Sequence, residues 1–357
     1  MSQEISLWQE LDILPDLDVL DRLLRDLLPG KNTSSMDFIE DVLKGNWVLE
    51  PDLFWRYLVS TVSGVLEGWK QLFISILVLF ILAALVSNLM SAFKNEGAAK
   101  AARTFFIICQ LVVLINAFGE VLEIVDSTMA QMIEFLKLMI PAYMICIAAA
   151  GSGLSALIFY KLLLGFLCLI EGIVAASLTP VVEGYVLLGV VESIWGEERF
   201  KGIMELIKKA IQWFLKTIIV VMSGSSILQV IITPVVDKAN NAVLQKTAGA
   251  IPGIGDIVES VSSVTLASAI AVKNSLGVLI LVVLVLLIAA PVIKSFMILF
   301  VIKVSGALGG LCGEKQMTKC VEYISDAGFM LLKILITVTT LFFVTIAAVT
   351  NATSSGL

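Results

Sequence analysis

Long apolar segments follow one another through most of this chain, and no other feature of the sequence constrains its fold as strongly. A transmembrane helix needs about 20 mostly apolar residues. Five segments meet that requirement: 69–93, 104–125, 210–236, 276–304 and 328–350. Hydrophobic residues make up 59% of the chain, whereas a soluble domain carries roughly 45–50%. The sequence therefore predicts an all-α fold, a polytopic bundle of transmembrane helices.

A sixth apolar tract, 138–191, is too long for one crossing. Its 54 residues are nearly three times the number, about 20, that a span needs. The tract is interrupted at Gly151-Ser152-Gly153, at Tyr160-Lys161 and at Thr179-Pro180. It fits either three short crossings, or one crossing and a re-entrant hairpin at the Gly-Ser-Gly break. These alternatives predict eight or six spans in the whole chain.

Lysine and arginine gather in three of the segments between spans. Segments 94–103, 192–209 and 303–333 hold three, four and four of them, whereas segment 126–137 holds one. Short cytoplasmic loops are enriched in these residues, so the pattern predicts that the three basic segments face the cytoplasm. The N-terminal region and the tail at 351–357 then lie outside.

The first 68 residues form a separate, acidic unit. Residues 1–68 contain 13 acidic and 5 basic side chains, a net charge of −8, while residues 69–357 carry a net charge of +2. Apolar residues at helical spacing predict two short amphipathic helices and a third helix that leads into the first span. We expect a small N-terminal helical head at 1–68, attached to a transmembrane helical domain at 69–357. The apolar faces of the head either pack on each other or dock a helix of another protein.

The segment 237–275 is more polar than the spans around it. Ile251-Pro252-Gly253 predicts a turn, because proline fixes φ and glycine permits positive φ. The residues after it place apolar side chains largely on one side. We expect an interfacial or re-entrant helix here, packed against the bundle.

Glu171 lies in the middle of an apolar tract, where a carboxylate costs on the order of 3 kcal/mol to insert. Such a side chain should face protein or water. Two interpretations stay open: a relay for an ion or a substrate, and a hydrogen bond between two helices.

Three prolines stand within similar local sequences in or beside apolar tracts. They are Pro180 in Thr-Pro-Val-Val-Glu, Pro234 in Thr-Pro-Val-Val-Asp and Pro291 in Ala-Pro-Val-Ile-Lys. Proline removes a helical hydrogen bond, so we expect a hinge or kink at each. The similarity indicates either a diverged repeat of kinked helices, as in many transporters, or chance matches between apolar sequences.

Motifs for catalysis and for cofactor binding are missing from the sequence. The chain has no histidine, which is the commonest general base and metal ligand. The patterns GxxxxGK[ST], GxSxG, HExxH and CxxC do not occur either. We predict a protein that is not an enzyme and binds no cofactor or metal. No basic stripe could neutralise phosphates, so the expected surroundings are the lipid bilayer and other proteins, not nucleic acid.

The order of several short motifs resembles a known family. The stretch 246–304 contains the Ile-Pro-x-Ile-Gly turn, then Val272-Lys273-Asn274, then a span with Ala290-Pro291-Val292-Ile293-Lys294. The head adds Leu27-Leu28-Pro29, Phe38-Ile39 and Gly45. Over nearly the whole chain, this arrangement resembles the stage III sporulation protein AE family of endospore-forming bacteria.

The resemblance implies a membrane subunit of a channel or secretion-like apparatus that joins the mother cell to the forespore. It implies a multi-pass protein of the mother-cell membrane that faces the forespore. The implied partners are other stage III sporulation operon proteins, including a separate ATPase subunit, and, indirectly, a forespore-membrane protein. Two rival interpretations remain. One is a stand-alone secondary permease or exporter that uses Glu171 and the proline-broken helices, and the other is a structural anchor without conduction.

Overall fold

A computed structural model describes residues 55–56, 59–60, 63, 66–93, 96–149, 165, 167–170, 172–195, 199–221, 224 and 255–352. The predicted helices of the head before residue 55, the turn at 251–253, Glu171 and Pro234 lie outside these residues. Within them, all regular secondary structure is helical. The predicted all-α class is confirmed.

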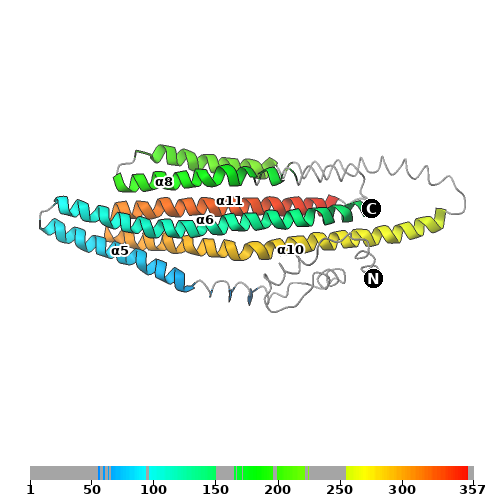
Figure 1. Cartoon of the computed structure of the whole chain (residues 1–357), viewed down its shortest axis with the longest axis horizontal. Helices are drawn as coiled ribbons and strands as arrows, with labels where there is room; N and C mark the ends of the chain where they lie inside the picture. The colour runs from blue at the N-terminus through cyan, green and yellow to red at the C-terminus, as the bar shows by residue number, and fades with distance from the viewer. Residues whose placement is uncertain are drawn as a thin grey trace.

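Long helices lie side by side along the longest axis of the molecule (Figure 1). They are α5 (Leu66–Ala92), α6 (Glu96–Ala149), the π-helix η1 (Val174–Leu178) that leads into α8 (Thr179–Trp195), a helix over residues 201–221, α10 (Gly255–Gly309), the short 3-10 helix η2 (Gly310–Cys312) and α11 (Lys315–Ala352). Helix α10 packs against α5, α6 and α11, while α8 packs mainly on α11.

Five of the described helices are long and apolar enough to cross a membrane. The candidate spans are Gly68–Ala92, Gly97–Phe135, Ala176–Trp195, Asn274–Cys312 and Lys315–Ala347. The 201–221 helix adds a sixth long element. The polytopic helical bundle is therefore confirmed in the described part of the chain. The predicted totals of six or eight spans stay predictions, because residues 150–164 of the tract 138–191 lie outside the described residues.

Two of the predicted breaks between spans were wrong. Helix α6 continues for 54 residues through the segment 126–137, which the sequence suggested was a linker. Helix α10 runs for 55 residues, from Gly255 to Gly309. It therefore includes residues 255–275 and continues into the next span without a break. At 1.5 Å per residue, each helix is about 80 Å long, more than twice the hydrocarbon thickness of about 30 Å. The reason is local: polar residues lower the hydropathy of 126–137 and 256–275, but neither stretch contains a glycine or proline that would end the helix.

The basic segments at 94–103 and 303–333 are also mostly helical. Helix α6 begins at Glu96, so only a short connection separates it from α5. Residues 310–314 alone separate α10 from α11, and Gly313 completes that connection with φ of +83° in the left-handed region. The α10–α11 connection is a tight helical hairpin.

Glycines bring three of these helices close together. A Cβ at Gly306 would overlap Val321 of α11, and one at Gly328 would overlap Leu299 of α10. Gly309 packs directly on the ring of Phe80 from α5. The segment from Gly306 to Gly313 therefore combines a close approach of helices at Gly306 and Gly309 with a turn at Gly313.

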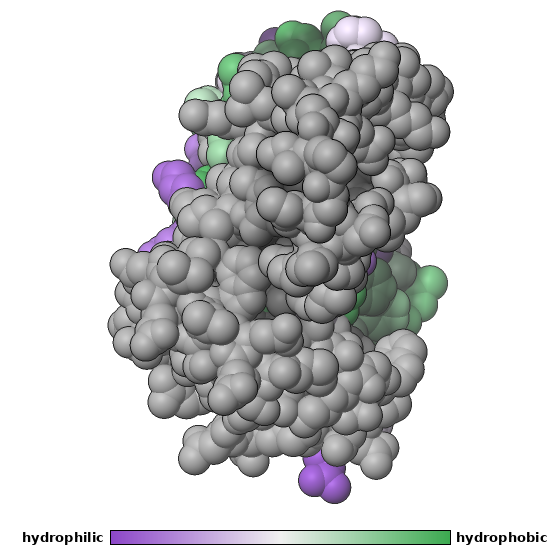
Figure 2. Space-filling view, turned by 90° about the vertical axis from the view of Figure 1, so that its right-hand side faces the viewer, coloured by the Kyte–Doolittle hydropathy of each residue, from purple (hydrophilic) through white to green (hydrophobic). Residues whose placement is uncertain are grey.

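Apolar side chains also cover the outside of the bundle. On α5, the exposed residues include Ile74, Ile81, Leu85 and Leu89. Figure 2 looks at the end away from the α5–α6 and α10–α11 hairpins, and among the described residues in view, hydrophobic ones lie at the right-hand side and along the upper edge. Exposed apolar surface along a long apolar helix is what a lipid-facing helix requires.

Candidate functional site

Three helix connections meet at one end of the bundle, on the left in Figure 1. They join α5 to α6, α8 to the 201–221 helix, and α10 to α11. These connections and the helix ends beside them carry most of the lysines and arginines of the three basic segments, Lys333 within α11 excepted, so these charges share one end of the bundle. The compartment that this end faces stays a prediction.

A cleft of about 600 Å³ lies between the three connections. We call it the turn-end cleft. Its polar and charged lining comes from the end of α5 and the first turns of α6 and α11, whereas Ile194 and Trp195 of α8 form an apolar wall. The side chains used below are Lys100, Arg103, Trp195, Glu314 and Lys315.

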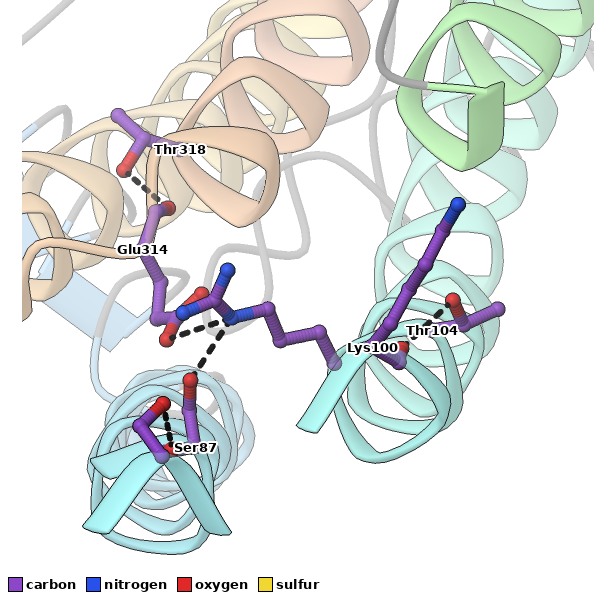
Figure 3. Close-up of polar contacts among 7 residues, drawn as sticks. Ser87, Lys100, Thr104, Glu314 and Thr318 are labelled. Atoms are coloured by element: carbon purple, nitrogen blue, oxygen red, sulfur yellow. Dashed lines mark hydrogen bonds and ion pairs between the residues drawn. The ribbon is translucent and has the colours of Figure 1, made fainter. Parts of the chain in front are cut away.

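Arg103 ties three helices together beside this cleft. Its Nε donates a hydrogen bond of 2.7 Å to Ser87 Oγ on α5 and lies 3.7 Å from Glu314 Oε1 just before α11. Figure 3 shows Ser87 and Glu314 on facing elements, joined through this guanidinium. The arginine fixes the α5–α6 hairpin relative to the start of α11.

Asp326 of α11 forms a second charged group inside the bundle. Its Oδ2 lies 2.5 Å from Lys208 Nζ of the 201–221 helix, and its Oδ1 lies 3.3 Å from Lys303 Nζ of α10. We call these three side chains the Asp326 network. The aspartate side chain is 26% exposed, so its neighbours screen it only partly from solvent. The network joins three helices and carries one net positive charge.

Glu192 near the end of α8 is the most buried carboxylate of this region, at 3% exposure. Its Oε2 accepts a hydrogen bond of 3.0 Å from the backbone N–H of Phe200. Its Oε1 has no hydrogen-bond partner among the described residues. The glutamate holds the connection that turns α8 into the 201–221 helix, and the guanidinium of Arg199 stacks on Trp195 at 5.6 Å within the same connection.

The prolines that the sequence singled out lie elsewhere. Pro180 is the second residue of α8 and is exposed. The π-helix η1 ends immediately before Thr179, whose N–H donates to the Val174 carbonyl. A widened turn relieves the clash between a proline ring and the preceding turn. Pro291 lies inside the continuous helix α10, so no break accompanies it. Glu171 and Pro234 fall outside the described residues, and their predicted roles stay predictions.

The sequence analysis predicts no role for Asp326, Lys208, Lys303 or Glu192, because all four lie between the predicted spans or at their ends. One signal was available for the Asp326 network. Each of its three charges lies within about two helical turns of an apolar run. A charge so close to a span needs a partner or water, although its partner cannot be read from the sequence.

The described residues contain no cluster of histidine, cysteine, aspartate and glutamate that could hold a metal ion. The charged groups here instead pair with each other, across helices that are far apart in the sequence. Asp326 and Lys208, for example, are separated by 118 positions. The chemistry that the arrangement provides is charge pairing between helices.

Comparison with known proteins decides the family. The sequence profile described as stage III sporulation protein AE matches residues 33–353. This chain belongs to the stage III sporulation protein AE family. The protein of that name from Bacillus subtilis (strain 168) is 21% identical over 329 residues, which cover 91% of this chain and 81% of the relative. No solved structure matches. Family membership assigns the chain a role in sporulation and confirms the resemblance seen in the sequence.

Proposed function

We propose that this chain is an integral membrane subunit of the apparatus that connects the mother cell to the forespore, a channel or secretion-like complex, and that it catalyses no reaction itself. The observation that carries the proposal is the family match over residues 33–353, which spans every described helix from the first candidate span to the last. A subunit of this kind contributes helices and charged contacts to a larger assembly.

The bundle supports this proposal in two ways. Its five candidate spans anchor it in a membrane, which we propose to be the mother-cell membrane facing the forespore. The three basic connections then lie in the mother-cell cytoplasm, where a separate ATPase subunit would have access to them. The acidic head at 1–68 would lie outside the cytoplasm, toward the forespore-membrane partner.

Purification from sporulating cells tests this proposal. A tag on this chain should bring down the other stage III operon proteins, including the ATPase, after mild detergent extraction. The control is the same tag on an unrelated multi-pass protein of the same membrane. Recovery of the chain with none of these proteins, under conditions that keep its helices folded, would contradict membership of the complex.

A stand-alone permease is the second candidate, and one observation favours it. The π-helical turn at η1 directly before Pro180 is the kind of interrupted helix that transporters use near their binding sites. The purified chain alone, reconstituted in liposomes, should then move a solute down its gradient. On our proposal the chain alone moves none, and flux appears only with the whole assembly.

A further inference from the structure

The turn-end cleft lies where the candidate membrane spans begin and end. Three of the five candidate spans end there, at Ala92, Trp195 and Cys312, and the other two begin there, at Gly97 and Lys315. Residues from four of these span ends or their connections line the cleft. A ligand in it would sit at the depth of the lipid headgroups.

The charges of the cleft favour an anion. Lys100, Arg103 and Lys315 line it, and Glu314 is the one acidic side chain in the lining. Glu314 lies beside Arg103 at 3.7 Å, so this pair is locally neutral. In Figure 3, Lys100 extends away from Ser87 and Glu314. Helix α11 begins at Lys315, which places the positive end of its dipole at the cleft.

The same cleft has apolar surroundings that fit acyl chains. Trp195, which forms one wall, is 60% exposed, and Leu311 in the neighbouring connection is 84% exposed. Exposed tryptophan at a helix end is typical of the membrane interface. A bound anion with a hydrocarbon tail would satisfy both parts of the site, whereas a small soluble anion would use only the charged part.

We propose that the turn-end cleft binds the phosphate headgroup of an anionic phospholipid, with Lys100 and Lys315 as the principal contacts and Trp195 against the lipid. Basic pockets between transmembrane helices are known to hold such headgroups. This inference needs only that the chain is a membrane protein, and it does not depend on the proposed role in the mother-cell apparatus.

Native mass spectrometry of the full chain in detergent tests the proposal. Dioleoyl phosphatidylglycerol and tetraoleoyl cardiolipin are titrated against the chain, with dioleoyl phosphatidylcholine as the neutral comparison. We expect one anionic lipid to be retained at lipid concentrations where phosphatidylcholine is lost. A juxtamembrane cation contributes roughly a fivefold factor in affinity, so the double variant K100Q/K315Q should bind this lipid about 25-fold more weakly.

The control variant is K209Q/K333Q, which removes the same charge at two exposed lysines outside the cleft lining. It should keep the bound lipid. Neither lysine of the cleft variant takes part in the Arg103 contacts, so K100Q/K315Q should unfold at the wild-type temperature, which is measured in parallel. The proposal would be overturned if phosphatidylcholine were retained as well as the anionic lipids. It would also be overturned if the cleft variant and the control variant lost the anionic lipid to the same extent. Displacement of the lipid by millimolar inorganic phosphate would show a free-phosphate site and would also overturn it.

Discussion

Replacing Gly309 with alanine should destabilise the bundle by roughly 1–3 kcal/mol, the usual cost of an overpacked core. The new Cβ would overlap three carbons of the Phe80 ring. That ring is fully buried and cannot turn away as a flexible side chain could, so α10 and α5 must separate. The gain in helix propensity, at most about 1 kcal/mol, does not offset this. Unfolding of the purified chain in mixed micelles measures the difference.

The neighbouring glycine supplies the control for this prediction. At Gly310 a Cβ would lie 3.4 Å from Thr318 Oγ1, a tight contact with a side chain that can adjust. Gly310→Ala should therefore stay within about 0.5 kcal/mol of wild type. Phe80→Leu added to Gly309→Ala should restore part of the loss, because the smaller side chain leaves room. If Gly309→Ala unfolds in the same way as wild type, Gly309 of α10 does not pack against Phe80 of α5, and the prediction is contradicted.

Replacing Asp326 with asparagine should cost about 2–3 kcal/mol of stability. The change leaves Lys208 and Lys303 beside each other without their shared carboxylate. Exposed ion pairs contribute about 0–1 kcal/mol, whereas breaking a buried pair costs about 3–5 kcal/mol. This network lies between those limits, because its three side chains are 26–48% exposed.

Two further variants separate charge pairing from a general effect of substitution. Lys208→Met combined with Asp326→Asn should be more stable than Asp326→Asn alone, because one of the two unpaired cations is gone. Glu205→Gln breaks the Lys209–Glu205 pair, whose side chains are 76% and 56% exposed, and should cost less than about 0.5 kcal/mol. Equal unfolding curves for Asp326→Asn and Glu205→Gln would refute the role of the Asp326 network.

The sequence predicts the class of fold and the grouping of the basic segments because these depend on local properties. Apolar runs of sufficient length must be helical in a membrane. Lysine and arginine then mark the ends of the helices on one side, and most of the charges of the three basic segments do lie near one end of the bundle. Only hydropathy and charge along the chain are needed for either step.

The lengths of the helices and the pairing of the charges could not be predicted in this way. Residues 126–137 lower the hydropathy, yet they contain no glycine or proline, so α6 continues through them. The partners of Asp326 come from two other helices, and only the packing of α10, α11 and the 201–221 helix brings them together. The contact of Gly309 with the Phe80 ring likewise depends on how α5 and α10 pack, which the sequence around either residue does not specify.

We predict that the three basic connections lie on one face of a membrane, the cytoplasmic face. Single cysteines at Phe93, Trp195 and Leu311, all exposed, and at Gly356 would be introduced into a variant without the native cysteines. A membrane-impermeant maleimide is then applied to intact and to permeabilised protoplasts of non-sporulating cells that express the variant. We predict that the first three positions react only after permeabilisation and that Gly356 reacts in intact protoplasts. Reaction of Phe93, Trp195 and Leu311 from different sides would contradict the claim.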